Sequence, residues 1–213
     1  PFDEDFVKQH PLDVEQRQDW TRLLPEESYA HADDGSGERP PRGWTTSFPH
    51  AIGTLGDAER HSPLWTASPL VDEYLGRLVE QSIDVLGLGR RDTTDFLAMS
   101  FSSLDSVGHA FGPRSHEVQD ALARIDRTLG RILARLDESI GRGNYIVALS
   151  ADHGVSPIPE QMPEQGLSAG RIASADVRDT INRTLGQRLG PGEYVSSVAY
   201  TDVYLAPGVN GKV

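Results

Sequence analysis

The chain of 213 residues contains no cysteine. This absence excludes disulfide bonds and thiolate zinc sites, so any metal ion must be bound by histidine, aspartate or glutamate. It does not fix the cellular compartment, because cysteine-free proteins occur in both reducing and oxidising spaces.

Long apolar runs and basic residues are also scarce. No stretch approaches the roughly 18 apolar residues of a membrane-spanning helix, and no signal peptide is visible. Twenty Lys and Arg against 32 Asp and Glu give a net charge of −12. This balance argues against a nucleic-acid-binding surface and against docking to anionic membranes. Because the chain begins at Pro1 rather than Met, we expect it to be a processed product or an excised segment of a longer protein.

The chain is long enough to bury a core, and its patterns suggest three regions. Residues 1–64 are irregular and hold seven of the 14 prolines. Their aromatic residues predict a segment that wraps over a core rather than a disordered one. Residues 65–160 are expected to form an α/β core, and residues 161–213 a small α+β appendage. The aromatic anchors of the first region are Trp20, Tyr29, Trp44 and Phe48.

The core region alternates helix and strand signals. Ser68 and Pro69 predict a helix start, and Gly87 predicts its end. A second helix is expected from Ser115 to Gly141, with Asp120 and Arg124 paired on its outer face.

Two short apolar runs flank that second helix. Residues 95–101 and 145–149 are typical of strands buried in a parallel sheet, and residues 102–114 between run and helix are expected to be a loop. A strand–helix–strand unit in one sheet implies a right-handed crossover. The predicted fold class is therefore α/β, a partial α/β/α sandwich with a mainly parallel sheet.

The appendage carries a third helix signal and two strand signals. Ser174 is the expected helix cap, with a buried side made of Val177, Ile181, Leu185 and Leu189. Short strands are expected near 194–199 and 202–206.

Two strings place a carboxylate beside an imidazole directly after the predicted strands. They are Asp105-Ser-Val-Gly-His109 and Asp152-His153-Gly154. Ligands of open α/β sheets bind at the carboxyl ends of strands, and a mixture of oxygen and nitrogen donors suits divalent metals. A helical turn or a compact loop can direct Asp105 and His109 to one centre, so the strings predict two partial metal sites.

Each string also has a structural interpretation. Asp-His-Gly is common in turns, and Asp105 could cap a helical turn. The other histidines lack such settings and are interpreted as surface or packing residues, with His50 and His116 the least secure in that role. They are His10, His31, His50, His61 and His116.

Residues 94–115, the Arg124-Ile-Asp126 string and residues 149–154 resemble the alkaline phosphatase superfamily. The closest likeness is to its type I phosphodiesterase/nucleotide pyrophosphatase branch, including periplasmic alkaline phosphatases with a threonine nucleophile. The resemblance implies two zinc ions, one bound by Asp105 and His109 and the other by Asp152 and His153. Two such cations stabilise the attacking and leaving oxygens of an in-line displacement.

The resemblance also implies groups that this sequence does not contain. They are an N-terminal Asp, a Thr or Ser nucleophile that forms a covalent phospho-intermediate, and a C-terminal His. We therefore expect a central segment of a phosphoric ester hydrolase, with no catalytic nucleophile assigned here and little or no activity of its own. The string Thr46-Ser-Phe-Pro-His50 is similar to the nucleophile region of nucleotide pyrophosphatases, but aromatic–proline packing is the favoured interpretation.

Several alternatives stay open at this point. A sulfatase, phosphonate hydrolase or phosphoglycerate mutase relative would share the superfamily, and a non-catalytic α/β binding domain would not. The implied partner is a small phosphate ester, monoester or diester. Exposed sheet edges would also permit a homo-oligomer. The resemblance implies a periplasmic or extracellular location.

Overall fold

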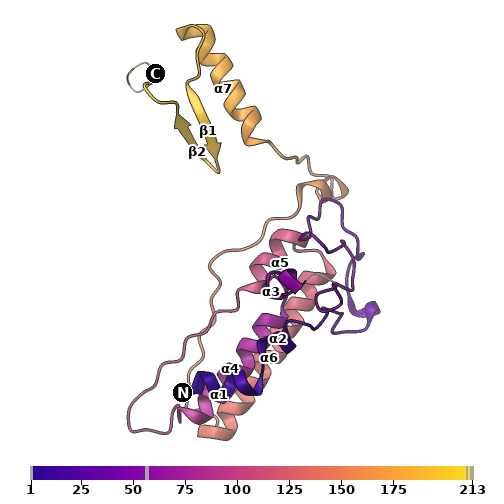
Figure 1. Ribbon diagram of the computed structural model, residues 1–213, viewed down its shortest axis with the longest axis vertical. Coiled ribbons are helices and arrows are strands. Elements are labelled where there is room, and N and C mark those ends of the chain that lie inside the picture. Colours follow the sequence, from indigo (N-terminus) through magenta and orange to yellow (C-terminus); the bar gives the residue numbers. More distant parts are fainter. Residues whose placement is uncertain (1, 56–57, 210, 212–213) are drawn as a thin grey trace. The chain divides into compact units, whose positions relative to one another are not determined.

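The computed structural model describes residues 2–55, 58–209 and 211, and the chain forms two compact units, Pro1–Gln165 and Gly166–Val213 (Figure 1). The first unit is helical. Its α-helices are α1 (Phe2–Gln9), α2 (Leu12–Glu15), α3 (His61–Thr66), α4 (Leu70–Val85), α5 (Ser103–Phe111) and α6 (His116–Ile140). Short 3-10 turns are η1 (Glu26–Ser28), η2 (Ala58–Arg60), η3 (Pro159–Gln161) and η4 (Pro163–Gln165). Among the described residues, no helix is both long and apolar enough to cross a bilayer.

The long helices α4 and α6 begin and end where local chemistry predicts. The Ser115 hydroxyl accepts a hydrogen bond from the Val118 amide at 3.1 Å and caps α6. Gly141 ends α6 with a φ of 86°, which an L side chain rarely adopts. Helix α4 starts one residue after Pro69 and stops just before Gly87. Both predicted helices are therefore confirmed.

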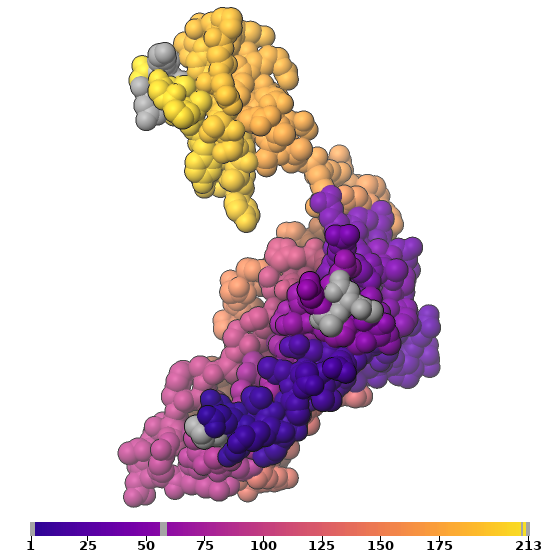
Figure 2. All heavy atoms as spheres, viewed as in Figure 1, coloured from indigo at the N-terminus to yellow at the C-terminus, as the bar shows by residue number. Residues whose placement is uncertain are grey.

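The N-terminal region packs over the helices of the first unit. Trp20, Trp44 and Ile52 are buried together with Val107 and Phe111 of α5 in one apolar cluster. In Figure 2 the indigo and violet atoms of this region cover one face of the first unit. Burial of large aromatic surface stabilises a segment with little regular structure of its own.

One prediction about α6 is wrong, because the N-terminal region covers the helix face concerned. Asp120 and Arg124 are paired, with Arg124 Nε donating to Asp120 Oδ2 at 2.6 Å. They do not lie on an outer face, because Asp120 is fully buried and Arg124 is 8% exposed. Asp120 also accepts hydrogen bonds from the Trp20 indole at 2.7 Å and the Tyr29 hydroxyl at 2.6 Å. The N-terminal region thus covers the helix face that looked solvent-exposed in the sequence.

The predicted parallel sheet is wrong. In the part of the chain that the structure describes, the only sheet is a two-stranded antiparallel one in the second unit. Residues 95–101 and 145–149 are unpaired coil, drawn without arrows in Figure 1. The α/β/α sandwich is therefore replaced by a mainly helical first unit.

The reason for this error lies in hydrogen bonding. An apolar run shows that side chains favour burial, but a strand forms only where neighbouring strands pair with its backbone groups. Neither run has such a neighbour among the described residues. Their apolar side chains consequently face solvent, with Phe96 92% and Ile146 98% exposed.

The second unit consists of α7 (Ser174–Leu189) and the hairpin of β1 (Val195–Ala199) and β2 (Asp202–Leu205). Both predicted strands and the helix are confirmed, although Ala173 rather than Ser174 is the N-cap. The Asn182 side-chain oxygen accepts from the Tyr194 and Val195 amides at 2.9 and 2.8 Å, which joins α7 to β1. The predicted buried side of α7 is only half-buried, and its Leu189 is 48% exposed.

Candidate metal centre

The first predicted ligand pair lies on one face of a helix. Residues 103–111, expected to be loop, form α5, so the helical-turn alternative for this string is the one observed. Val107 and Phe111 point into the core, whereas Asp105 and His109 lie one turn apart on the exposed face. Asp105 Oδ1 is 3.4 Å from His109 Nε2.

The second pair follows the unpaired run 145–149. Asp152 Oδ1 accepts a hydrogen bond from the His153 amide at 3.0 Å, which makes a tight local turn. The His153 Nδ1 atom lies 3.0 Å from the Gly154 carbonyl oxygen. A carbonyl only accepts, so Nδ1 carries the proton, and in the neutral ring Nε2 has a free lone pair.

The Nε2 atom lies near both carboxylates. His153 Nε2 lies 3.5 Å from Asp152 Oδ2 and 3.5 Å from Asp105 Oδ1. Asp105 Oδ1 therefore lies within ion-pair distance of imidazole nitrogens from both strings. The structure brings all four predicted residues to one place, although no sheet carries them.

Electrostatics at this place favour cations. The hydrogen bond to the Gly154 carbonyl, followed by the charge of Asp152, raises the pKa of His153. All four side chains are well exposed, from 52% for Asp105 to 87% for Asp152. They are therefore accessible to an ion and to a small substrate.

The donor set fits a zinc-type metal in chemistry and spacing. Zinc binds histidine nitrogen and carboxylate oxygen at about 2.0–2.1 Å, so two ligands of one tetrahedral ion stand about 3.3–3.4 Å apart. The carboxylate oxygen and imidazole nitrogen of Asp105 and His109 are 3.4 Å apart, and those of Asp152 and His153 are 3.5 Å apart. Both distances are close to this separation between two ligands. Among the described residues, however, no group of three or more His, Asp or Glu side chains is placed to hold a metal ion. By donor chemistry alone, each pair has only two of the ligands that a tetrahedral ion requires.

The two strings also meet through Val155. Gly108 is buried in α5, and a Cβ built on it would lie 3.7 Å from Val155 Cγ2, an ordinary contact distance. An alanine would therefore fit at this position.

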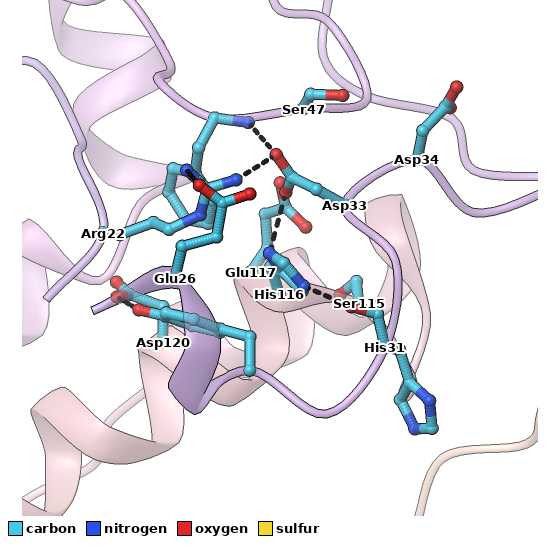
Figure 3. A network of polar contacts seen from close by, with 12 residues as sticks. Arg22, Glu26, His31, Asp33, Asp34, Ser47, Ser115, His116, Glu117 and Asp120 are labelled. Carbon is cyan, nitrogen blue, oxygen red and sulfur yellow. Dashed lines mark hydrogen bonds and ion pairs between the residues drawn. The ribbon is translucent and has the colours of Figure 1, made fainter. Parts of the chain in front are cut away.

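His50 and His116 are buried and make polar contacts away from the two strings, and Figure 3 shows the network around His116. His50 Nε2 lies 2.8 Å from Glu117 Oε1, and both side chains are fully buried. His116 Nδ1 lies 3.2 Å from Asp33 Oδ1, and Asp33 also accepts from Arg22 at 2.5 Å. The packing interpretation of His50 and His116 is confirmed, but the sequence analysis missed their carboxylate partners. Nothing in the spacing of Asp33 or Glu117 indicates these contacts.

The Thr46-Ser-Phe-Pro-His50 string also packs. Phe48 lies edge-on to Trp20 with ring centroids 5.1 Å apart, and the Thr46 hydroxyl donates to Asp34 at 2.8 Å. These contacts confirm its aromatic packing role.

Comparisons with known proteins agree with the resemblance. A family model described as type I phosphodiesterase / nucleotide pyrophosphatase matches residues 18–184. Alkaline phosphatase PhoV of Synechococcus elongatus is 39% identical over 67% of this chain and 26% of its own length. Alkaline phosphatase PafA of Elizabethkingia meningoseptica is 31% identical over 87% of this chain and 34% of its own. A Myroides odoratus protein named calcium-transporting ATPase is 34% identical over 94% of this chain and 37% of its own.

The fold agrees as well. The crystal structure of wild-type PafA superposes with a TM-score of 0.82 and 29% identity, covering 99% of this chain and 40% of that chain. The chain thus spans between a quarter and two fifths of the length of these relatives. Since the family model covers most of its residues, the chain belongs to the type I phosphodiesterase/nucleotide pyrophosphatase family of the alkaline phosphatase superfamily.

Proposed function

We propose that Asp105, His109, Asp152 and His153 are ligands of a two-zinc centre that hydrolyses phosphate esters. Asp105 and His109 would bind one ion, and Asp152 and His153 the other. A Thr or Ser nucleophile lying outside this chain would complete the site. A periplasmic or extracellular location belongs to the same proposal.

The observation that carries this proposal is the position of the Asp105 carboxylate. One of its oxygens lies 3.4 Å from His109 Nε2 and 3.5 Å from His153 Nε2. The two ligand pairs therefore adjoin, as a pair of ions about 3.5–4 Å apart requires.

The chain's own residues would prepare the site before an ion arrives. The Gly154 carbonyl holds His153 in the tautomer whose Nε2 can bind metal. The carboxylates of Asp105 and Asp152 offset part of the positive charge. When bound, two zinc ions would supply Lewis-acid stabilisation of the attacking and leaving oxygens.

The relatives support phosphate esters as the substrate class. Two of them are named alkaline phosphatases, and the family model is named for phosphodiesterases and nucleotide pyrophosphatases. Monoesters and diesters both fit these names, so the proposal covers both.

Zinc titration of the chain by isothermal calorimetry tests the proposal. We expect Asp105→Ala and His153→Ala to weaken zinc binding at least tenfold, because each removes a ligand from a partial site. Inorganic phosphate should bind the zinc-loaded chain and not the metal-free chain.

His31→Ala is the matched control. The His31 side chain is exposed and points away from the neighbouring network, so its loss should leave zinc affinity unchanged (Figure 3). Equal zinc affinity in the wild type, Asp105→Ala and His153→Ala would overturn the metalloenzyme assignment.

A further inference from the structure

The helix that carries Asp105 and His109 lacks a cap of its own. The N-cap residue of α5, Ser102, makes no side-chain capping hydrogen bond. The first amides of a helix have no partner within it, and an uncapped first turn frays. Asp105 lies in that first turn, so fraying would displace a proposed metal ligand.

A distant carboxylate supplies the missing cap. Asp72 Oδ1 accepts from the Ser102 amide at 3.3 Å. Asp72 Oδ2 accepts from the Ser103 amide at 3.2 Å and from the Ser103 hydroxyl at 2.5 Å. The negative charge also lies at the positive end of the α5 dipole, where it is favourable.

The packing of α4 holds the Asp72 cap in place. Asp72 belongs to the first turn of α4 and is only 5% exposed. Helix α4 in turn packs on α6 so closely that a Cβ at Gly76 would stand 2.2 Å from Thr128 Cγ2. At the other end of α5, Val107 and Phe111 are anchored in the aromatic core.

On the basis of the proposed function, we propose that Asp72 is a positioning residue of the metal centre. By capping α5 from α4, Asp72 fixes the position and orientation of the α5 turn that places Asp105 and His109 close to His153. Asp72 lies outside both metal-binding strings, and it acts through Ser102 and Ser103 rather than on the ion.

Amide hydrogen exchange and zinc affinity together test this role. In Asp72→Ala we expect the exchange rates of the Ser102 and Ser103 amides to rise at least tenfold, because their acceptor is lost. Zinc affinity should fall about tenfold, the usual effect of losing a residue that orients a ligand. Asp72→Asn keeps one acceptor oxygen and should fall between wild type and Asp72→Ala in both measurements. If Asp72→Ala does not fold, Asp72→Asn tests the same proposal by the same two measurements.

Asp84→Ala is the control on the same helix. Asp84 pairs with Arg135 of α6 at 2.5 Å, so its loss weakens helix packing without touching α5. Both measurements should stay at wild-type values in the folded Asp84→Ala protein.

The two proposals fail in different ways. If Asp105→Ala weakens zinc binding while the Asp72 variants bind as wild type does, the positioning role is wrong and the metal centre stands. If Asp105→Ala has no effect on zinc binding, the proposed function is wrong. The exchange rates then show separately whether Asp72 caps α5.

Discussion

At the scale of single residues, Asp120 joins parts of the chain that are far apart in sequence. Its carboxylate accepts from Trp20, 100 residues earlier, and from the Leu23 amide, the Tyr29 hydroxyl and Arg124. Each donor is buried or partly buried, so each would lose its partner if the carboxylate were removed. Asp120 therefore holds the N-terminal region on α6.

We expect Asp120→Ala to lower the free energy of unfolding by about 3–5 kcal/mol, because it breaks the buried ion pair with Arg124 and leaves the Trp20 and Tyr29 donors without their acceptor. Asp126→Ala on the exposed side of the same helix should change it by less than about 0.5 kcal/mol. Urea unfolding measures both. A loss below about 1 kcal/mol for Asp120→Ala would contradict the central role of this carboxylate.

Glu117 and His50 make the stability of the fold depend on pH. Burial raises the pKa of Glu117 to about 8 and lowers the pKa of His50 to about 4. Burial and the Glu117 charge also raise the pKa of Glu38 to about 8. Between about pH 4 and pH 8, Glu117 is a neutral acid that can donate a hydrogen bond to the neutral His50 ring.

The sign follows from proton linkage. Glu117 holds its proton more tightly in the folded state, so its contribution is full below pH 4.5 and is lost as the pH rises through about 8. The contribution of His50 is full above pH 6.5 and is lost as the pH falls through about 4. Up to pH 6.5, the pH dependences of Glu117 and His50 have opposite signs. Above pH 6.5, the buried carboxyl groups lose their contribution as the pH rises, and exposed His153, whose pKa is also raised, adds to the same loss.

We therefore expect the urea midpoint of the wild type to fall between pH 6.5 and 8.5. Residue 117 cannot ionise in the Glu117→Gln variant, so the urea midpoint of this variant should fall less over the same pH interval. The ionisation of Glu38 contributes to the fall that remains. Equal losses in the two proteins would show that Glu117 does not ionise in this range.

At the scale of elements, the contact between α4 and α6 depends on Gly76. A Cβ there would lie 2.2 Å from Thr128 Cγ2, well inside van der Waals contact. Gly130 of α6 offers the opposite case, because a Cβ at that position meets nothing within 4 Å. Substitutions at these two glycines therefore distinguish the effect of packing from the effect of helix propensity on stability.

Gly76→Ala should destabilise the fold by about 1–3 kcal/mol through overpacking. Gly130→Ala should stabilise it by about 0.5–1 kcal/mol, the gain in helix propensity. Thr128→Ala should reduce the harm done by Gly76→Ala, because it removes the clashing methyl group. Thermal unfolding compares the four proteins, and a stabilising Gly76→Ala would contradict the close packing of α4 on α6.

Elements with strong local signals could be predicted from the sequence. Ser115 and Gly141 mark α6, and the turn between Ala199 and Asp202 marks the hairpin. Helix α5 was expected to be a loop, because it is short and because its cap, Asp72, comes from a distant helix. The burial of Asp120 was missed for a related reason, since its partners come from the N-terminal region.

At the scale of the whole molecule, the predicted sheet is wrong and the metal site stays a prediction. The four ligand candidates were chosen from residue type and spacing, and in the structure Asp105 lies within 3.5 Å of His109 and His153. The sheet expected to carry them is absent from the described residues, because apolar runs alone do not supply pairing strands. Convergence arises instead from α5 and from the turn after residue 149.

The unpaired runs predict self-association of the chain. Phe96, Ile146 and Leu149 are 92%, 98% and 82% exposed, and unpaired backbone beside apolar side chains favours pairing with another chain. Sedimentation velocity should show oligomers of the wild type and monomers of a Phe96→Lys/Ile146→Lys variant. Ile172→Lys, at an 80% exposed site in the second unit, should behave as the wild type does. A monomeric wild type would contradict this expectation.

The two-metal centre is tested most directly by anomalous X-ray scattering at the zinc edge from zinc-soaked crystals of the chain. We expect two peaks about 3.5–4 Å apart, one beside Asp105 and His109 and the other beside Asp152 and His153. A map without peaks at these four side chains, from crystals in which zinc binds elsewhere, would contradict the assignment.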